Sequence, residues 1–383
     1  MIVKIANHPR DYAWGSKTLM ADYFGWRETG APMAEVWFGT HPGSPATLAD
    51  NPHVTLREHI GQDLPFLLKL LAADRPLSIQ AHPNLEQARA GFERENAAGL
   101  PLSAAMRNYR DANHKPEAIV ALTNFEALCG FRSLPQIKNL LLDMVEAPDA
   151  SETFVAIAKQ WLDAFIADGL AALVAAILRP QLGGEPIVLD GFNAELARMA
   201  DFSARFELAS RLNELHPGDP GVVLALLLNH VYLEPGEALY LPAGNVHAYL
   251  GGLGVEVMAS SDNVLRGGLT SKHIDVPELL SVLDFESAAV PRIQPRELAH
   301  GLVEFPVAAA DFKLYRASVS AGNLLAEIAL PAAAIALCVG GDVALTDSRG
   351  SAVNLRRGEA AYLSPEARHF TLAGNGDCFI ALG

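Results

Sequence analysis

The chain has little cysteine, little positive charge and no long apolar run that is free of turn-forming residues. Its three cysteines, Cys129, Cys338 and Cys378, are scattered through 383 residues and stand among apolar neighbours. Such an odd, dispersed set is typical of free thiols in a reducing compartment and argues against a disulfide framework or a CxxC metal site. We therefore expect a cytoplasmic protein.

Positive charge is scarce because 29 Lys and Arg face 44 Asp and Glu, which gives a formal net charge of −15. That field repels nucleic acid, and no run of Lys or Arg supplies a local basic patch. The opening MIVKIANHPRDYAWG lacks the apolar run of a signal peptide. The longest uncharged stretch, residues 238–255, carries proline, asparagine, histidine and four glycines, which no lipid-exposed helix would carry. We expect a soluble protein without a nucleic-acid or membrane partner.

The texture of the sequence changes twice along the chain. Residues 1–133 hold short β-like runs such as AEVWFGTHPGSP, separated by glycine, proline and asparagine. From residue 134 to residue 215 the chain is rich in alanine and leucine, with apolar side chains at helical spacing, as at Phe154, Ile157 and Trp161. Short strand-like runs return after residue 216. This pattern predicts a mainly β protein with a helical insertion.

One short segment of the β-rich part recurs near the C-terminus. GEALYLPAGNVH (236–247) and GEAAYLSPEARH (358–369) share Gly, Glu, Ala, Tyr, Leu and the final His without a gap, which favours a duplicated β-unit. His369 aligns with His247, but residues 308–367 contain no other histidine, so we expect the second unit to be structural and metal-free. The predicted domains are a discontinuous β-domain of residues 1–133 and 216–300, a helical insert of residues 134–215, and a C-terminal β-domain of residues 301–383.

Polar and apolar side chains alternate in PLSIQAHPN, residues 76–84. Because a strand points successive side chains to opposite faces, Ser78, Gln80 and His82 are expected to project together from one face. That polar face either lines a cleft or is the solvated face of an edge strand.

A second polar group stands at the start of the apolar run in NHKPEAIVAL, residues 113–122. Lys115 and Glu117 fall on one side of this extended segment. A carboxylate and an ammonium at the mouth of a buried strand are costly unless they pair or bind something. A simple ion pair at a strand end is the alternative.

A third polar group is the histidine that ends YLPAGNVH, after a strand and a Pro-Ala-Gly turn. A lone histidine is more often structural than a ligand. Combined, however, Gln80, His82, Glu117 and His247 offer two imidazoles, one carboxylate and one amide oxygen from three separate strands. Two histidines and a carboxylate are a ligand set for zinc or for non-haem iron. Because glutamine is neutral, a divalent metal held by this set would stay Lewis-acidic.

These segments resemble those of one known family. PLSIQAHPN, NHKPEAIVAL, FEALCGFR, YLPAGNVHAYL and VEVMASSDNVLRGGLTSKHIDVPELL, together with YAWGS and AEVWFGTHP, are similar to the motifs of type I mannose-6-phosphate isomerase, also called phosphomannose isomerase. The similarity extends over nearly the whole chain outside the helical insert and the C-terminal part. It implies two cupin-type, jelly-roll β-barrels plus an all-α domain. It also implies a zinc enzyme that interconverts mannose 6-phosphate and fructose 6-phosphate.

The resemblance also assigns roles to individual residues. It implies one zinc ion per chain, held by Gln80, His82, Glu117 and His247. It places the active-site arginine at Arg266, with its neighbours in the site at Lys115, His114, Glu256 and Asp262. It associates phosphate and sugar binding with Lys69, Ser78, Lys115 and Arg266. For Lys69, which lies in the apolar run PFLLKLLAAD, the alternative is a snorkelling lysine at the end of a helix or strand.

An aldose–ketose interconversion moves a proton between C1 and C2 through an enediol, so it needs a base, an acid and a group that holds the developing charge. The chain offers no GxGxxG after a strand and no GxxxxGK[ST] loop, so no nucleotide cofactor is expected. The residue that transfers the proton stays open among Glu256, Asp262, His114, Lys115, Arg266 and a zinc-bound water. We favour Arg266 for positioning and charge, and Glu256 or Asp262 for proton transfer.

Two other functions fit parts of this pattern. A metal-dependent oxygenase on a cupin barrel would also use two histidines and a carboxylate, but Gln80 and the lysine and arginine cluster argue against it. A non-catalytic cupin that binds sugar phosphates would have to keep every ligand and Arg266 without turnover. The sequence leaves the oligomeric state open, and a monomer is consistent with it.

Overall fold

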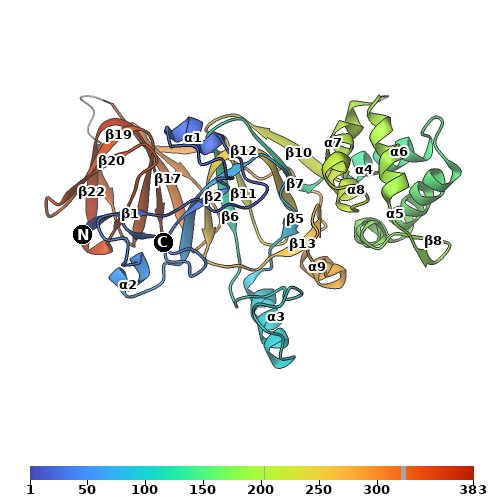
Figure 1. Cartoon of the computed structure of the whole chain (residues 1–383), viewed down its shortest axis with the longest axis horizontal. Coiled ribbons are helices and arrows are strands. Elements are labelled where there is room, and N and C mark those ends of the chain that lie inside the picture. The colour runs from blue at the N-terminus through green and yellow to red at the C-terminus, as the bar shows by residue number, and fades with distance from the viewer. Residues whose placement is uncertain (202, 321–324) are drawn as a thin grey trace.

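The computed structural model describes residues 1–201, 203–320 and 325–383, and it is mostly β-strand with several helices. The mainly β character predicted from the sequence is therefore confirmed. Figure 1 shows an elongated molecule, with strands at the left and in the centre and the helices of residues 134–226 grouped at the right. Both termini lie at the strand-rich end.

The first of two ten-stranded sheets is organised by its longest strand, β12 (His247–Ala259). The start of this strand pairs with β5 and β7, and its later part pairs with β4 and β6, all antiparallel. One strand thus brings four others together. The other strands of this first sheet are β2 (Glu35–Phe38), β4 (Phe66–Ala73), β5 (Ile79–Ala81), β6 (Glu117–Ala121), β7 (Phe125–Phe131), β10 (Leu228–Leu233), β11 (Ala238–Leu241), β13 (Leu265–Gly268) and β14 (Arg292–Ile293).

The second ten-stranded sheet has two long central neighbours, β19 and β22, which pair antiparallel over most of their length. Its strands are β1 (Ile2–Ala6), β3 (Thr47–Leu48), β15 (Arg296–Ala299), β16 (Leu302–Phe305), β17 (Lys313–Val319), β18 (Leu325–Ala329), β19 (Ala334–Asp347), β20 (Ala352–Arg356), β21 (Ala360–Leu363) and β22 (His369–Leu382).

The N-terminal strand corrects the predicted grouping of strands. Residues 1–133 were expected to form one unit with residues 216–300, but β1 pairs with β21, and β3 pairs with β1, so both belong to the second sheet. The alternation in IVKIA indicates a strand, and it does not encode which neighbour that strand pairs with.

The helices begin and end mostly where the sequence signals them. Ser133 and Gln136 form a capping box at the start of α4, and α5 ends two residues before Pro180. The helices are α1 (Leu19–Phe24), α2 (Leu56–Ile60), α3 (Leu85–Ala97), α4 (Leu134–Val145), α5 (Glu152–Leu178), α6 (Asp190–Arg198), α7 (Glu207–Leu215), α8 (Gly221–Leu226) and α9 (Val276–Val282). Minor elements are the hairpin β8 (Gln181–Leu182) and β9 (Glu185–Pro186), and the 3-10 turns η1 (Met199–Asp201), η2 (Ala204–Phe206) and η3 (Pro365–Ala367).

Two helices stand where β structure was expected. Helix α3 lies inside the first β-rich segment, where Asn84 and Gln87 form a capping box that announces it. Helix α8 follows residue 216, where strand-like runs were expected to return at once. Its sequence GVVLAL is short and uniformly apolar, and such a run does not distinguish a buried strand from a buried helix.

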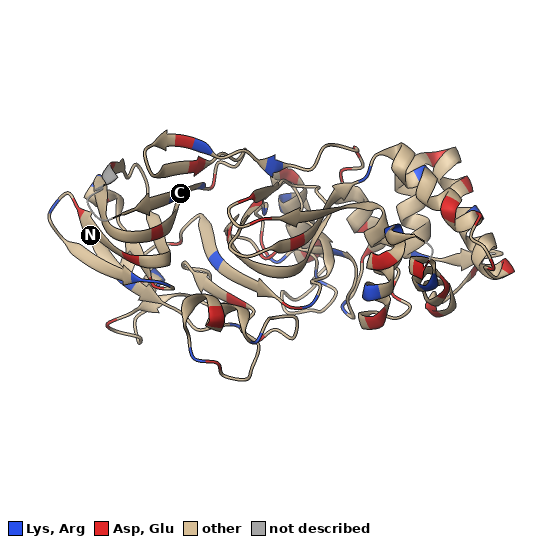
Figure 2. Cartoon of the chain, turned by 90° about the horizontal axis from the view of Figure 1, so that it is seen from above, with Lys and Arg blue, Asp and Glu red and all other residues tan. Residues whose placement is uncertain are grey.

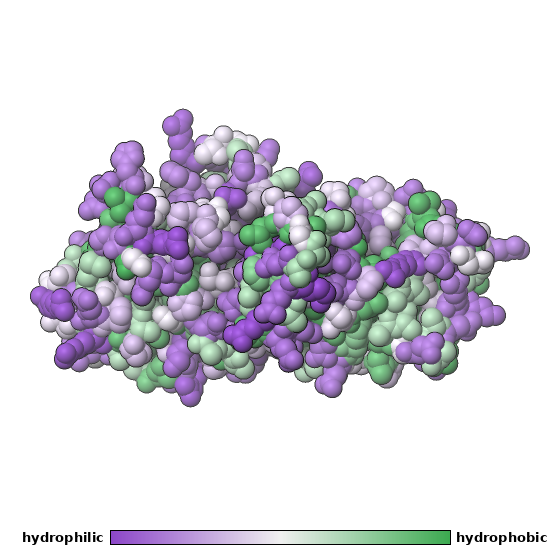
Figure 3. Space-filling model, turned by 90° about the horizontal axis from the view of Figure 1, so that it is seen from below, coloured by the Kyte–Doolittle hydropathy of each residue, from purple (hydrophilic) through white to green (hydrophobic). Residues whose placement is uncertain are grey.

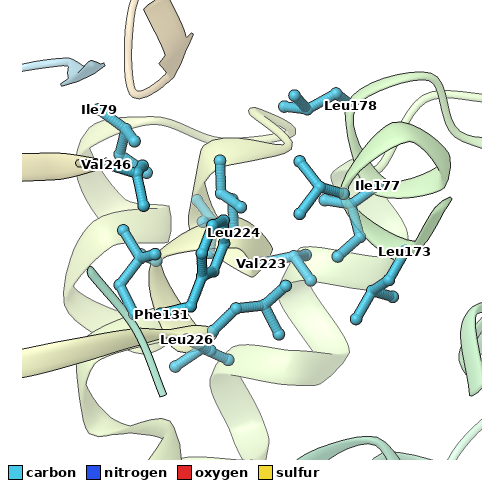
Figure 4. Close-up of a cluster of buried hydrophobic side chains, with 14 of the residues drawn as sticks. Ile79, Phe131, Leu173, Ile177, Leu178, Val223, Leu224, Leu226 and Val246 are labelled. Atoms are coloured by element: carbon cyan, nitrogen blue, oxygen red, sulfur yellow. The ribbon is translucent and has the colours of Figure 1, made fainter. Parts of the chain in front are cut away.

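Helix α5 is long and apolar enough to cross a membrane by length and composition alone. Its backbone breaks at Gly169, where φ is 81°, so it consists of two helical segments. Its residues Leu173 and Ile177 belong to the same buried cluster as Val223 and Leu224 of α8 and Phe131 of the first sheet, with α8 lying between them and Phe131 (Figure 4). A core helix of this kind passes the same composition test, so the membrane signal is weak.

The two sheets share one hydrophobic core. Val120 and Val255 from the first sheet belong to the same buried cluster as Ile335 and Phe379 from the second, with Phe312 just before β17. This continuous packing holds the two sheets in a fixed relation.

Lys and Arg are interspersed with Asp and Glu along the chain (Figure 2), and the face seen in Figure 3 mixes hydrophobic and hydrophilic areas.

Candidate active site

Three potential metal ligands converge inside the first sheet. His82, Glu117 and His247 offer ligand atoms that all lie within 4.8 Å of one another, and all three residues are buried. Glu117 Oε2 lies 3.4 Å from His82 Nε2 and 3.3 Å from His247 Nε2. Glu117 begins β6 and His247 begins β12, while His82 follows β5, so three strands supply the cluster, as the sequence predicts.

The histidine rings are oriented by backbone carbonyls. His82 Nδ1 lies 2.7 Å from the carbonyl oxygen of Asn263, and His247 Nδ1 lies 3.0 Å from that of Asn245. A carbonyl can only accept, so Nδ1 carries the proton and Nε2 is left with a free lone pair. This is the arrangement by which proteins orient histidine ligands toward a metal.

The electrostatics of the cluster favour a neutral His82 imidazole beside an ionised Glu117 carboxylate. Burial, together with Lys115, lowers the pKa of His82 to about 4. Burial alone would raise the pKa of Glu117, but Lys115, 2.8 Å away, and His82 hold it well below its usual range. Neutral histidine and ionised glutamate are the protonation states that bind a metal.

Gln80 lies beside this cluster. It is the residue of β5 that pairs with His247 on one side and with Arg266 of β13 on the other. Its side-chain amide nitrogen lies 3.4 Å from His247 Nε2. The amide group therefore reaches the place where the histidines and Glu117 meet.

A cavity of about 610 Å³ opens next to the cluster. Ser78, Gln80, Lys115 and Glu117 all line it. The further sequence-predicted residues on its wall are Lys69, Glu256, Asp262 and Arg266. A pocket of this size, with a few convergent charged groups, is typical of a small-molecule site.

Lys69 lies in the middle of β4, only 6% exposed, so the snorkelling interpretation is wrong. It stands directly opposite Glu256 of β12, and its Nζ lies 3.1 Å from Glu256 Oε2 and 3.7 Å from Glu35 Oε1. Burial alone would lower the pKa of Lys69, but Glu35 and Glu256 raise it above its ordinary value. Lys69 is therefore a buried, charged ammonium between two carboxylates.

Glu256 is fixed on both of its oxygens. Oε1 accepts a hydrogen bond of 2.9 Å from the hydroxyl of Tyr249, and Oε2 accepts one from Lys69. Burial raises the pKa of Glu256, and Lys69 acts in the opposite direction. A carboxyl group with a raised pKa on a cavity wall is suited to accept and return a proton.

Arg266 marks the basic side of the cavity. Burial and nearby Arg110 lower its pKa. Lys272 and Arg75 line the same cavity, so several cations gather there in a chain of net negative charge. Such a group of cations attracts an anion.

Two predicted residues have surroundings that the sequence did not indicate. Asp262 is largely exposed, and its Oδ2 lies 3.5 Å from His41 Nε2. His114 is turned toward Asp311: its Nε2 lies 2.8 Å from Asp311 Oδ2. The structure therefore brings Asp262 to the cavity wall and directs the ring of His114 to the C-terminal part of the chain.

Sequence reasoning missed several cavity residues. Glu35, Trp37 and Trp14 line the cavity, and so do Arg75 and Lys272. Trp37 stands opposite Lys69 on β2, and its indole nitrogen donates to Glu35. The segments YAWGS and AEVWFGTHP contain these tryptophans and Glu35, but nothing in their spacing indicated which side chain faces the site.

Comparison with known proteins identifies the family. The family described as phosphomannose isomerase type I, catalytic domain, matches residues 2–134. The mannose-6-phosphate isomerase of Escherichia coli K12 is 38% identical over 393 aligned positions, which cover 97% of this chain and 97% of the relative. The chain belongs to the mannose-6-phosphate isomerase family. The Homo sapiens mannose-6-phosphate isomerase is 32% identical over 369 positions, covering 87% of this chain and 84% of the relative.

Solved structures of this family have the same fold as this chain. The mannose 6-phosphate isomerase of Salmonella typhimurium, bound to its substrate and to a zinc atom, superposes with a TM-score of 0.88 at 35% identity. The apo form of the Salmonella enzyme gives the same TM-score at 34% identity. Both comparisons cover 100% of this chain and 99% of the other.

Proposed function

We propose that this chain is a zinc-dependent isomerase that interconverts mannose 6-phosphate and fructose 6-phosphate by moving a proton between C1 and C2. The observation that carries the proposal is the meeting of a buried His82–Glu117–His247 cluster with a cavity whose wall holds both cations and carboxylates. Family membership supports the choice of substrate, and the geometry of the cavity supports the roles proposed for its side chains.

The cluster fits a zinc ion by a test independent of the relatives. His82 Nε2 and Glu117 Oε2 are buried and make no hydrogen bond within the described part of the chain. Leaving such atoms unpaired costs free energy, unless a bound group satisfies them. Two imidazoles, a carboxylate and the Gln80 amide form a ligand set that suits zinc. When bound there, zinc supplies Lewis acidity toward the oxygens of the sugar.

The cationic side chains of the cavity are assigned two roles: binding the substrate's phosphate and positioning the reacting groups. The guanidinium of Arg266 can bind phosphate or sugar oxygens through two parallel hydrogen bonds. Lys115 reaches from beside the metal cluster, where it is 2.8 Å from Glu117 Oε1. Ser78 offers a hydroxyl on the same wall of the cavity. Lys69 acts indirectly, because its ammonium holds the carboxylate of Glu256.

Proton transfer is assigned to Glu256 or Asp262, which both line the cavity. Glu256 is held by Tyr249 and Lys69 in a fixed orientation, which favours transfer at a defined carbon. Asp262 stands near His41 and is more exposed, which suits exchange of the transferred proton with solvent. Arg266 and Lys115 add positive charge where the enediolate oxygens would lie.

The proposal extends to the arrangement of the chain. We infer two cupin-type barrels, one around the first sheet and one around the second, with an all-α domain inserted over residues 134–215. The first barrel would be built by residues 1–133 and 216–300, apart from β1, β3 and β15, and the second by residues 301–383 together with those three strands. The functional partner is a sugar phosphate, with neither nucleic acid nor membrane, and the cytoplasm stays the expected location.

The test is a coupled assay of purified protein on mannose 6-phosphate. The protein is stripped with a chelator, assayed, and then resupplied with zinc; activity should disappear and return. Oxygen consumption with iron in place of isomerisation would favour an oxygenase. Binding of mannose 6-phosphate by calorimetry without turnover, in protein that holds zinc, would favour a binding protein.

A further inference from the structure

A hydrogen bond between two side chains joins the loop that precedes β6 to the C-terminal part of the chain. His114 Nε2 lies 2.8 Å from Asp311 Oδ2, between residues 197 positions apart in the sequence. Both side chains are mostly buried, with 25% and 16% of their surface exposed. At such a partly buried position a charge-assisted hydrogen bond is stronger than one at the surface.

The backbone on either side of His114 and Lys115 is already held. The carbonyl of Asn113 accepts hydrogen bonds from Asn263 Nδ2 at 2.8 Å and from Ser261 Oγ at 3.2 Å. The carbonyl of Pro116 accepts one of 3.1 Å from the backbone nitrogen of Ala259. Between these two anchors, the ring of His114 provides a third, and Lys115 extends from this short turn to Glu117 Oε1.

The other end of this hydrogen bond is rigid. Phe312, next to Asp311, is 1% exposed and belongs to the core shared by the two sheets. A Cβ atom built on Gly383 would lie 2.2 Å from the carbonyl oxygen of Asp311, so the last residue of the chain packs directly against this backbone. The backbone that carries the Asp311 carboxylate is therefore held in a fixed position.

We propose that Asp311 is a positioning residue for the active site: it holds the ring of His114, and through it the turn from which Lys115 reaches the metal cluster. This inference rests on the proposed function and gives the C-terminal part of the chain a task in that site. Asp311 neither lines the cavity nor belongs to the cluster, so it acts through His114. Small displacements of a reacting group are costly, since about 1 Å is enough for a loss of about 100-fold.

The test compares Asp311→Ala, Asp311→Asn and the double variant Asp311→Ala with His114→Ala, in the zinc-loaded full chain. Asp311→Ala should lower kcat about tenfold, part of the loss that a 1 Å displacement causes, with little change in KM. Asp311→Asn keeps an accepting oxygen and should recover most of kcat. In the His114→Ala background, Asp311→Ala should add no further loss, because its partner is gone.

The matched control is Asp377→Ala. Asp377 is also an aspartate of the C-terminal part, but it pairs with Arg316 on the second sheet. It should leave kcat unchanged, and an equal loss in Asp377→Ala and Asp311→Ala would overturn the proposal. So would full activity of Asp311→Ala, or losses that multiply in the double variant.

Amide hydrogen exchange separates this inference from the proposed function, since it needs no substrate. Exchange of the peptide covering residues 108–117 should rise in Asp311→Ala and not in Asp377→Ala. If the wild-type chain shows no isomerase activity, the proposed function fails, while the exchange result still decides whether Asp311 holds the turn. Unchanged exchange at residues 108–117 would contradict the proposal.

Discussion

The segment that ends in His247 and the segment that ends in His369 fold alike and differ in what surrounds the histidine. In each, a strand of four residues, β11 or β21, is followed by a five-residue connection and a long strand that begins with the histidine, β12 or β22. His247 is 1% exposed and 3.3 Å from Glu117. The side chain of His369 is 37% exposed, and its Nε2 lies 3.4 Å from Oε1 of the exposed Glu327.

This comparison separates what a local sequence determines from what a site needs. The shared residues produce the same strand, connection and strand, because these depend on local turn and pleat chemistry. A metal centre additionally needs donors from other strands, and β5 and β6 bring His82 and Glu117 to His247. Among the described residues, His82, Glu117 and His247 form the one such group.

The largest effect is expected from the histidine of the first sheet. His247→Ala should abolish both zinc retention and turnover, and so should His82→Ala, because each variant loses one of the two imidazole ligands and keeps only one imidazole, one carboxylate and a weak neutral amide. His369→Ala is the matched control and should leave both nearly unchanged. Metal analysis and the coupled assay on the same samples measure the difference, and loss of zinc in His369→Ala would break the comparison.

Arg266→Ala should have the next largest effect. If Arg266 only clamps phosphate, KM rises and kcat stays; if it also stabilises charge in the transition state, kcat falls too. We expect kcat to fall about 100-fold, the scale found when one preorganised donor is removed. Arg266→Lys should restore part of the loss, because lysine keeps the positive charge but lacks the planar guanidinium that makes two parallel hydrogen bonds. A kcat near the wild-type value in Arg266→Ala would leave this residue a binding role alone.

Substitutions of Lys69 and Lys4 allow a buried ion pair of the first sheet to be compared with a surface ion pair of the second. Lys69→Ala leaves Glu35 and Glu256 buried without their cation, and should lower the free energy of unfolding by about 3–5 kcal/mol. Lys4 pairs with Glu359 at 2.8 Å near the surface, and Lys4→Ala should cost about 0–1 kcal/mol. Urea unfolding of both variants checks this, and equal losses would contradict the assignment of Lys69 as a buried charge.

The smallest effect concerns acid stability. Burial alone would raise the pKa of Glu126, but His230 and Arg211 lower it to about 2, below the unfolded value of 4.5. A depressed carboxyl pKa adds stability above pH 4.5 that is lost as the pH falls from about 4.5 towards 2. In Glu126→Gln the free energy of unfolding should therefore fall less as the pH is lowered from 4.5 to 2, by about 1 kcal/mol after solvent screening. An unchanged profile in Glu126→Gln would refute the linkage.

The candidate metal ligands were accessible from sequence because each stands in a short pattern with its own geometry. Alternation in PLSIQAHPN placed Gln80 and His82 together, and the structure brings both to His247. The insert was readable because Ser133, Pro135 and Pro180 punctuate a long helical spacing. Strand alternation and helix-boundary residues are local features, so they can be recognised in the sequence without knowledge of the fold.

What the sequence could not show are the partners brought together by strand pairing. Lys69 and Glu256 are 187 positions apart and meet because β4 and β12 pair in one register. His114 meets Asp311 across the two sheets for the same kind of reason. The pairing of β1 with the second sheet is equally non-local, since one strand pattern fits several edges.

The central claim is that the first sheet holds a complete metal site and the second sheet holds none. Elemental analysis of purified protein, with activity on mannose 6-phosphate measured on the same sample, tests it most directly. The account predicts one zinc per chain, and activity that rises in proportion to zinc up to that ratio. Two metals per chain, or full activity in protein from which chelation has removed all metal, would contradict it.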